Sequence, residues 1–430
     1  MTDNAQSENP QKVASTHGFS SSLEGLRVLD MSRVLAGPIC GQILADLGAD
    51  VIKVEKPGKG DDSRAWGPPF LLDTNGQPTT ESAFYVSCNR GKRSIAIDLR
   101  KPEGRDLIKR LAAISDVLLE NYKVGTLERY GLGYDELAKI NPRLIYCSIT
   151  GFGQTGPYAS RPGYDTIIQA MGGLMSVTGR EDGAPGGGPV RVGAALIDFM
   201  TGLYGTIAVQ AALSYREKTG HGQQIDLSLL DVGISALANI AMNYLVSGEI
   251  PVRRGNRLPT VYPSDAFQCS DGYIMIIIGN DEQFQRFCAA ANIESIAQDE
   301  RFRSNDFRVV NADLLSIEIT KALSKKPLGH WLTTLEKVKV PCSAINNLAQ
   351  VFDDPQVKAR GMQLDLDHPL SGRIPTIANP IGFSKSPASY HLPPPLLGQH
   401  TEEILRDVLS LSNSEIEKLS LLGTVVQSKT

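Results

Sequence analysis

Asp198 is the residue whose setting best suits covalent chemistry. It stands in the segment LIDFMTG, after an apolar run and before a long stretch with helical periodicity. One interpretation is a helix N-cap, whose carboxylate only accepts backbone N–H bonds. The other is a nucleophile, because the helix dipole and free N–H groups would keep the carboxylate ionised. An ionised carboxylate in a cleft is a usable attacking group, and the two interpretations do not exclude each other.

A second candidate site is the loop Arg33–Pro38, with the sequence RVLAGP. It follows the first predicted strand and precedes a predicted helix, which is where α/β proteins bind anionic ligands. The next strand ends in Glu55, where a dinucleotide-binding protein places an acidic residue. However, Gly37 and Gly41 do not form the G-x-G-x-x-G pattern, which disfavours NAD binding.

Cationic and aromatic side chains gather near the ends of the predicted strands. Singly, each is explained as a solvated charge or a packed ring, but together they could hold a phosphorylated nucleotide. They are Lys56, Arg90, Lys92, Arg93, Arg100, Tyr122, Lys123 and Arg129. The histidines show no H-x-x-H spacing and there is no G-x-S-x-G segment, so neither a metal site nor a hydrolase elbow is indicated.

The elements that must position these residues alternate between strand and helix. LRVLDMS, ADVIKVEKP, SIAIDL, DVLLENY and RLIYCSIT read as buried strands, and EGRDLIKRLAAI and YDELAKIN as helices between them. This alternation predicts the α/β class, with a doubly wound parallel sheet.

The middle of the chain has a different pattern, which suggests a second, smaller α+β domain. Residues 151–195 are rich in Gly and Pro, and a helix is expected over Phe199–Glu217. Strands are expected through Ala266-Phe267 and over Ile274–Ile278, followed by a helix over Asp281–Ala291. We therefore predict a disordered tail over residues 1–22, a large domain over 23–220, a linker and small domain over 221–335, and a return to the large domain over 336–430.

Composition narrows the classes of function. The 430 residues carry a formal net charge of −4, which argues against nucleic-acid binding. No uninterrupted apolar run approaches the roughly 20 residues of a membrane span. The six cysteines lack C-x-x-C spacing and are expected to be thiols in a reducing compartment. The polar start of the chain resembles neither a secretory signal nor a presequence, so a cytoplasmic location is expected.

Several long motifs, taken in order, resemble the family III CoA-transferases, which include formyl-CoA:oxalate and carnitine CoA-transferases and the α-methylacyl-CoA racemases. The motifs are LEGLRVLDMSRVLAGPICGQILADLGADVIKVEKPGKGDDSR, NRGKRSIAIDLRKPEG, LLENYKVGTLERYGLGYDEL, NPRLIYCSITGFGQTGPY, RPGYD, REKTGHGQQIDLSLLD, VPCSAINN and PPLLGQHTEEIL. They extend over about residues 23–405, and the chain looks closest to the succinate–hydroxymethylglutarate type.

The resemblance implies a large Rossmann-like domain, a smaller domain and two chains interlocked as a homodimer. It implies CoA or acyl-CoA as substrate, no permanently bound cofactor and no metal. The nucleophile of the transferases falls on Asp198, with Asp165 and Asp182 as rivals if the alignment has slipped. The CoA contacts of the family fall on Val34, Leu35, Ala36, Lys56, Ile97, Arg100, Asn121, Tyr122, Lys123, Arg129, Tyr164 and Asp165.

Two departures bear on the reaction. The oxalate enzymes have a glutamine at the position of Leu35 in this chain, and they have a run of glycines at about the position of Leu258–Val261. Both differences argue against oxalate as substrate. The racemases have a catalytic histidine where this chain has Tyr164, which ranks α-carbon racemisation below transfer. A CoA-binding homologue without catalysis is a further alternative.

The reaction implied by the resemblance is CoA transfer through an aspartyl mixed anhydride and an aspartyl-CoA thioester, with succinyl-CoA or a similar donor. Backbone N–H groups near Phe199 are expected to stabilise the oxyanions. A second substrate carboxylate would need a cation, which Arg253, Arg254 or Arg257 could supply; these arginines are equally well explained as a solvated loop.

Overall fold

The computed structural model describes residues 21–428, so most of the predicted tail lies outside the described residues. The chain forms two compact units. Unit 1 comprises Met1–Met171, Ala194–Ala236 and Gly361–Thr430, and unit 2 comprises Gly172–Gly193 and Leu237–Arg360. These boundaries differ from the predicted ones: the second unit takes up part of the Gly-rich segment and extends over residues 336–360, whereas residues 221–236 belong with the first.

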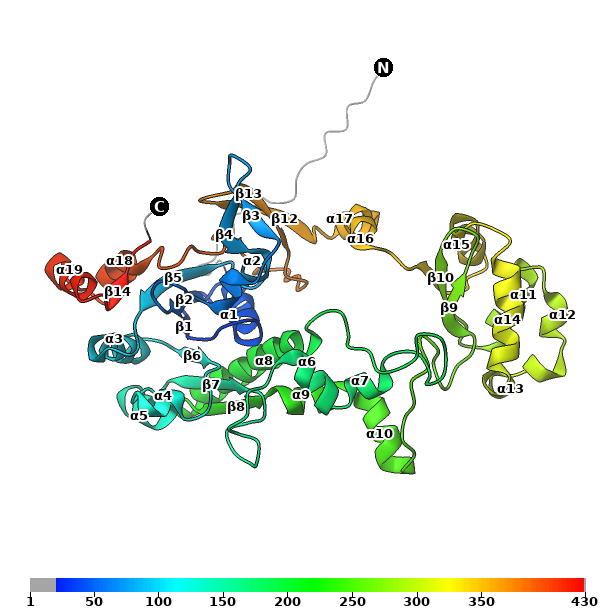
Figure 1. Cartoon of the computed structure of the whole chain (residues 1–430), viewed down its shortest axis with the longest axis horizontal. Helices are drawn as coiled ribbons and strands as arrows, with labels where there is room; N and C mark the ends of the chain where they lie inside the picture. Colours follow the sequence, from blue (N-terminus) through cyan, green and yellow to red (C-terminus); the bar gives the residue numbers. More distant parts are fainter. Residues whose placement is uncertain (1–20, 429–430) are drawn as a thin grey trace, which may run out of the picture. The chain divides into compact units, whose positions relative to one another are not determined.

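Unit 1 is built on a seven-stranded sheet with the order β14-β5-β2-β1-β6-β7-β8 (Figure 1). The strands are β1 (Arg27–Asp30), β2 (Asp50–Glu55), β5 (Lys92–Ile97), β6 (Val117–Glu120), β7 (Ile145–Thr150), β8 (Gln224–Ser228) and β14 (Val425–Val426). All neighbours are parallel except β14, which is antiparallel to β5. From β5 to β8 the order is that of a doubly wound dinucleotide-type sheet. The predicted α/β class with a mostly parallel sheet is confirmed.

Helices cover both faces of this sheet because successive strand residues point to opposite sides. Leu29, Ile52 and Leu118 face a core that they share with α3 (Pro102–Ala113) and α5 (Tyr134–Ile140). On the other face α1 (Ala36–Asp46) follows β1 directly, and α8 (Leu196–Thr219) packs against α1 and β7.

The close approach of α1 and α8 depends on Gly202. A Cβ atom added there would lie 2.6 Å from Cγ2 of Ile39 and 2.9 Å from the carbonyl oxygen of Ala36. Only a residue without a side chain allows the two helices to touch at this point. Because Asp198 precedes Gly202 by one helical turn, this contact fixes Asp198 near the beginning of α1.

Unit 2 has its own core between a small antiparallel sheet and helices. The sheet has the order β11-β10-β9, with strands β9 (Ser264–Gln268), β10 (Tyr273–Ile277) and β11 (Cys342–Ala344). The helices α11 (Asp281–Ala290), α14 (Ala312–Leu323) and α15 (Leu328–Lys337) bury Phe287, Leu315 and Trp331 in that core.

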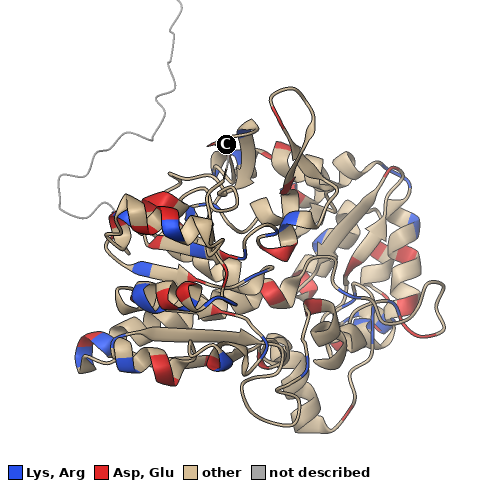
Figure 2. Ribbon diagram, turned by 60° about the vertical axis from the view of Figure 1, so that its left-hand side comes forward, with Lys and Arg blue, Asp and Glu red and all other residues tan. Residues whose placement is uncertain are grey.

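Figure 2 shows Lys and Arg interspersed with Asp and Glu along the ribbon, in keeping with the net charge of −4.

The helix α8 is long and apolar enough to cross a membrane by length and composition, with a mean hydropathy of 1.3 over its best 18-residue window. The sequence analysis predicted a helix here, over Phe199–Glu217, but it considered only uninterrupted apolar runs and did not identify this helix as long and apolar enough to span a membrane. A core helix passes the same test, and α8 packs on the sheet and on α1 within unit 1. This packing explains the buried face of α8, whereas Phe199 and Ile207 on the same helix are exposed in the single chain.

Candidate active site

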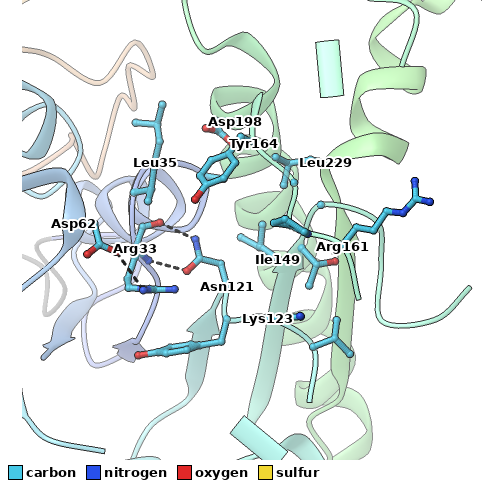
Figure 3. A pocket seen from close by; sticks show the side chains of 18 of the residues that line it. Arg33, Leu35, Asp62, Asn121, Lys123, Ile149, Arg161, Tyr164, Asp198 and Leu229 are labelled. Carbon is cyan, nitrogen blue, oxygen red and sulfur yellow. Dashed lines mark hydrogen bonds and ion pairs between the residues drawn. The ribbon is translucent and has the colours of Figure 1, made fainter. Parts of the chain in front are cut away.

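The crevice of unit 1 lies where the strand order reverses, between β1 and β6. Arg33 follows β1 and Asn121 follows β6, and the two residues join the strand ends. The backbone N–H of Arg33 donates to Oδ1 of Asn121 at 2.8 Å, and Nδ2 of Asn121 donates to the carbonyl oxygen of Arg33 at 2.6 Å (Figure 3). Ligands of doubly wound sheets bind at such a switch point.

Two cavities lie at this edge of the sheet. The Asp198 cavity, of about 270 Å³, is lined by Asp198, Tyr164 and the loop after β1. The Lys56 cavity, of about 460 Å³, is lined by residues that follow β2 and β5, Lys56 among them. Arg33 and Tyr122 line both cavities, so these two side chains stand at their boundary.

Most residues predicted to bind CoA line one of these cavities. Val34, Leu35, Ala36, Asn121, Tyr122, Lys123 and Tyr164 line the Asp198 cavity. Lys56, Ile97, Arg100 and Tyr122 line the Lys56 cavity. Arg129, at the end of α4 (Thr126–Arg129), is exposed and lines neither, and Asp165 also lines neither.

Asp198 lies in the first turn of α8 but is not its N-cap, so that interpretation is wrong. The helix begins at Leu196, and Asp165 supplies the capping carboxylate from elsewhere in the chain. Oδ2 of Asp165 accepts the backbone N–H of Ile197 at 2.8 Å and that of Asp198 at 3.1 Å. Nε2 of Gln169 donates to Oδ1 of Asp165 at 2.6 Å, which orients the capping group.

The half-buried Asp198 carboxyl group is less readily ionised than an exposed one. Burial raises its pKa to about 7, and the negative charge of Asp165 adds to this effect. None of the described residues donates a hydrogen bond to the Asp198 carboxylate. We expected the helix start to lower the pKa of Asp198 and keep the group ionised; this expectation is wrong, because the pKa is raised. A poorly solvated carboxylate is in turn a more basic and more reactive nucleophile.

The expected oxyanion donor near Phe199 is also not available. The backbone N–H of Phe199 donates to the carbonyl oxygen of Ala195 at 3.1 Å, as the fourth residue of an ordinary helical turn does. This N–H is already engaged within α8, so the expectation is wrong.

The loop after β1 is held in a strained backbone conformation. Val34 has a φ of 72°, which is unfavourable for a β-branched residue. Its N–H donates to both carboxylate oxygens of Asp61 at 3.2 Å, and Nζ of Lys53 donates to Oδ2 of Asp61 and to the carbonyl oxygen of Ser32, both at 3.0 Å. Lys53 and Asp61 are fully buried. This network positions the loop. The sequence analysis singled out neither Lys53 nor Asp61, and the one local signal that could have drawn attention to them is the acidic pair in KGDDSR.

A second acidic residue, Asp62, links two cations at the boundary of the cavities. Its Oδ2 lies 3.3 Å from Nη1 of Arg33, and its Oδ1 lies 2.7 Å from Nζ of Lys56. The guanidinium of Arg33 also lies over the ring of Tyr122, 4.9 Å from the centroid. Sequence reasoning recognised Arg33 only as the start of a loop and did not single out Asp62.

The rival nucleophile Asp182 and the candidate arginines belong to unit 2. Asp182 is paired with Arg253, which also donates to the carbonyl oxygen of Ser176 at 3.0 Å. Arg257 pairs with Asp313 at 2.7 Å. Arg254 lines a cavity of about 480 Å³ and has no ion-pair partner among residues 21–428. Of the three arginines, Arg254 is therefore the one whose charge is not neutralised within the described chain.

The position of Tyr164 depends on a close approach of two loops. A Cβ atom on Gly151 would lie 2.6 Å from Cα of Gly163, so the segment before Tyr164 lies directly against the end of β7. Leu35, Tyr164 and Asp198 gather at one side of the cavity in Figure 3. Histidine is not among the residues that line this cavity in the described chain.

Comparisons with known proteins show which family this chain resembles over its length. The model of CoA-transferase family III matches residues 23–401. A succinate–glutarate CoA-transferase of Agrobacterium fabrum is 46% identical over 397 residues, which cover 91% of this chain and 97% of that protein. A succinyl-CoA:glutarate CoA-transferase of Mus musculus is 43% identical over 408 residues, covering 95% and 91%.

Among solved structures, a CaiB/BaiF family protein from Brucella suis superposes with a TM-score of 0.82 at 46% identity. The match covers 91% of this chain and 100% of that one. The family match spans most of the chain. The chain belongs to CoA-transferase family III.

Proposed function

We propose that this enzyme transfers CoA between small dicarboxylic acids, with succinyl-CoA and glutarate as the first pair to test. The relatives named for succinate and glutarate support this choice. The observation that carries the mechanism is the position of Asp198, a half-buried carboxyl group in a cavity at the switch point of the sheet.

The proposed reaction is covalent catalysis in two exchanges. A carboxylate oxygen of Asp198 attacks the thioester carbonyl carbon, the C–S bond breaks, and CoA leaves as a thiolate. The thiolate then attacks the aspartyl carbonyl of the mixed anhydride, which frees the donor acid and leaves an aspartyl-CoA thioester. The acceptor carboxylate attacks that thioester, and the same steps run in reverse.

The two cavities suggest how CoA lies in the site. The Lys56 cavity, lined by Lys56 and Arg100 as well as apolar Ile97, has the mixed character that an adenine nucleotide needs. The pantetheine arm would then extend past Tyr122 to the Asp198 cavity. In this arrangement, the thioester end of the substrate reaches the nucleophile and the phosphates remain near the cations.

We also propose the interlocked homodimer and a cytoplasmic location. The helix α8 exposes Ile207, and α10 (Ala238–Ser247) exposes Leu245 and Val246, which are 62%, 72% and 80% exposed in the single chain. Such apolar side chains on each unit favour coverage by a second copy. The six free thiols, of which five are buried, favour a reducing compartment.

The test is incubation with succinyl-CoA, with and without glutarate, followed by intact-mass analysis and hydroxylamine treatment. We expect formation of glutaryl-CoA and a hydroxylamine-sensitive adduct at Asp198. Asp198→Asn should lose both, with Asp106→Asn on the surface of α3 as a control that removes one carboxylate outside both cavities. Full-rate transfer by the Asp198→Asn protein would overturn the proposal.

A further inference from the structure

The pairing of Asp62 with Arg33 and Lys56 has no evident role in stability. The Asp62 and Lys56 side chains are each 46% exposed, and that of Arg33 is 35% exposed. Exposed ion pairs of this kind contribute little to folding. The pairing does, however, place one carboxylate against two cations at the boundary of the Asp198 and Lys56 cavities.

Arg33 is held so that its guanidinium stays at this boundary. Its backbone is fixed by Asn121 on one side, and its guanidinium lies over Tyr122, which also lines both cavities. Its Nε is buried and has no hydrogen-bond partner among the described residues. The side chain therefore has unused donor capacity where the cavities meet, and its partner Asp62 at 3.3 Å makes only a long contact.

We propose that Arg33 and Lys56 bind the diphosphate of CoA and that the Asp62 carboxylate occupies this site in its absence, competing with the phosphates. The inference rests on the proposed function, since it requires the nucleotide in the Lys56 cavity and the thioester in the Asp198 cavity. The diphosphate is the part of CoA that joins adenosine to pantetheine. A residue that lines both cavities is therefore best placed to contact it.

The competition follows from charge. The Asp62 carboxylate pairs with Arg33 and Lys56 as a phosphate would. A phosphate that binds there must displace Asp62 from the N–H donors of both cations, and it is then repelled by the nearby Asp62 charge. Asp62 thereby weakens the binding of CoA. An enzyme that exchanges one CoA thioester for another must release its product, and a resident carboxylate favours that release.

The test is calorimetric binding of CoA, dephospho-CoA and pantetheine to the full chain, in the absence of any acyl donor. Dephospho-CoA lacks only the 3′-phosphate, and pantetheine lacks every phosphate. Asp62→Asn should bind CoA and dephospho-CoA about two- to fivefold more tightly, which is the range expected for the loss of exposed charge pairs. Arg33→Gln should weaken both by about tenfold, as loss of a charge-assisted bond predicts. Neither variant should change pantetheine binding.

Asp106→Asn is the matched control, because it makes the same charge change on unit 1 outside both cavities. Unchanged or weaker CoA binding by Asp62→Asn would overturn the inference, as would an equal gain for pantetheine. A gain for CoA that dephospho-CoA does not share would assign the cations to the 3′-phosphate instead of the diphosphate. Failure of the unaltered protein to bind CoA at all would contradict the proposed function itself.

Discussion

Asp165 accepts the backbone N–H of Asp198 at 3.1 Å, so one carboxylate caps the helix that carries the other. This relationship has two opposite effects on Asp198. It fixes the beginning of α8 and hence the position of the attacking group. It also places a negative charge nearby, which adds to burial in raising the pKa of Asp198 to about 7.

The first prediction is a pH dependence of Asp198 acylation. Only the ionised carboxylate attacks, so the rate of adduct formation from succinyl-CoA should rise with pH and level off above about 7. Below that value, it should fall about tenfold per pH unit. Single-turnover quench followed by mass analysis measures the step directly. A rate that stays constant between pH 5 and pH 8 would show that the pKa of Asp198 lies outside this range or that Asp198 is not the attacking group.

The second prediction concerns Asp165→Asn. The amide oxygen can still accept the N–H bonds of α8, but the neighbouring charge is lost. The midpoint of the acylation profile should therefore move to lower pH by about one unit, while burial keeps it above that of a free aspartate. A lower plateau with an unchanged midpoint would mean that Asp165 acts only through position. Asp106→Asn, with the same change of charge, should leave the midpoint unchanged.

The third prediction is a pH-dependent gain in stability on Asp198→Asn. The folded protein keeps the Asp198 proton up to about pH 7, whereas the unfolded chain releases it near the ordinary value of 3.8. Ionisation therefore destabilises the fold as pH rises through this window. The variant has no such cost, so its advantage in the free energy of unfolding should be larger at pH 8 than at pH 5. The difference should be on the order of 1 kcal/mol, below the full value of the pKa shift because the group is half-buried. Urea unfolding at both pH values measures it.

The sequence was most informative where strands are apolar throughout. β1, β2, β6 and β7 are buried on both faces, and their mostly apolar sequences identified them as strands, although the buried Lys53 interrupts β2. β8 was missed because it lies at the edge of the sheet, where Gln224 and Asp226 are exposed and break the apolar run. The two residues of β14 are too few to give any pattern.

The site was predictable in its members but not in its electrostatics. Local sequence placed Asp198 near a helix start, and the family resemblance supplied most of the cavity lining. The N-cap interpretation failed because the capping carboxylate comes from Asp165, which is 33 residues away and adjacent only in the fold. The raised pKa of Asp198 likewise depends on burial and on Asp165, and no local pattern encodes either.

The fourth prediction concerns the glycine contact between α1 and α8. Gly202→Ala would place a methyl group 2.6 Å from Ile39 and 2.9 Å from the Ala36 carbonyl oxygen, which forces the helices apart. We expect a loss of about 1–3 kcal/mol in the free energy of unfolding and slower acylation of the displaced Asp198. Gly329→Ala on α15 is the matched control, because no atom lies within 4 Å of its added Cβ. Helix propensity predicts that the control is stabilised, so a similar loss in both variants would contradict the role of the contact.

The fifth prediction tests whether Arg254 selects dicarboxylic acids. Arg253 and Arg257 are neutralised by Asp182 and Asp313, whereas Arg254 has no ion-pair partner within residues 21–428. If Arg254 binds the second carboxylate of the acceptor, Arg254→Met should raise the KM for glutarate about tenfold or more, as loss of a charge-assisted bond predicts. The same variant should leave the KM for a monocarboxylate such as butyrate unchanged, because that acid has no group for the guanidinium to bind. Equal effects on the two acids would assign Arg254 to general positioning, and no effect on either would leave it as a solvated loop residue.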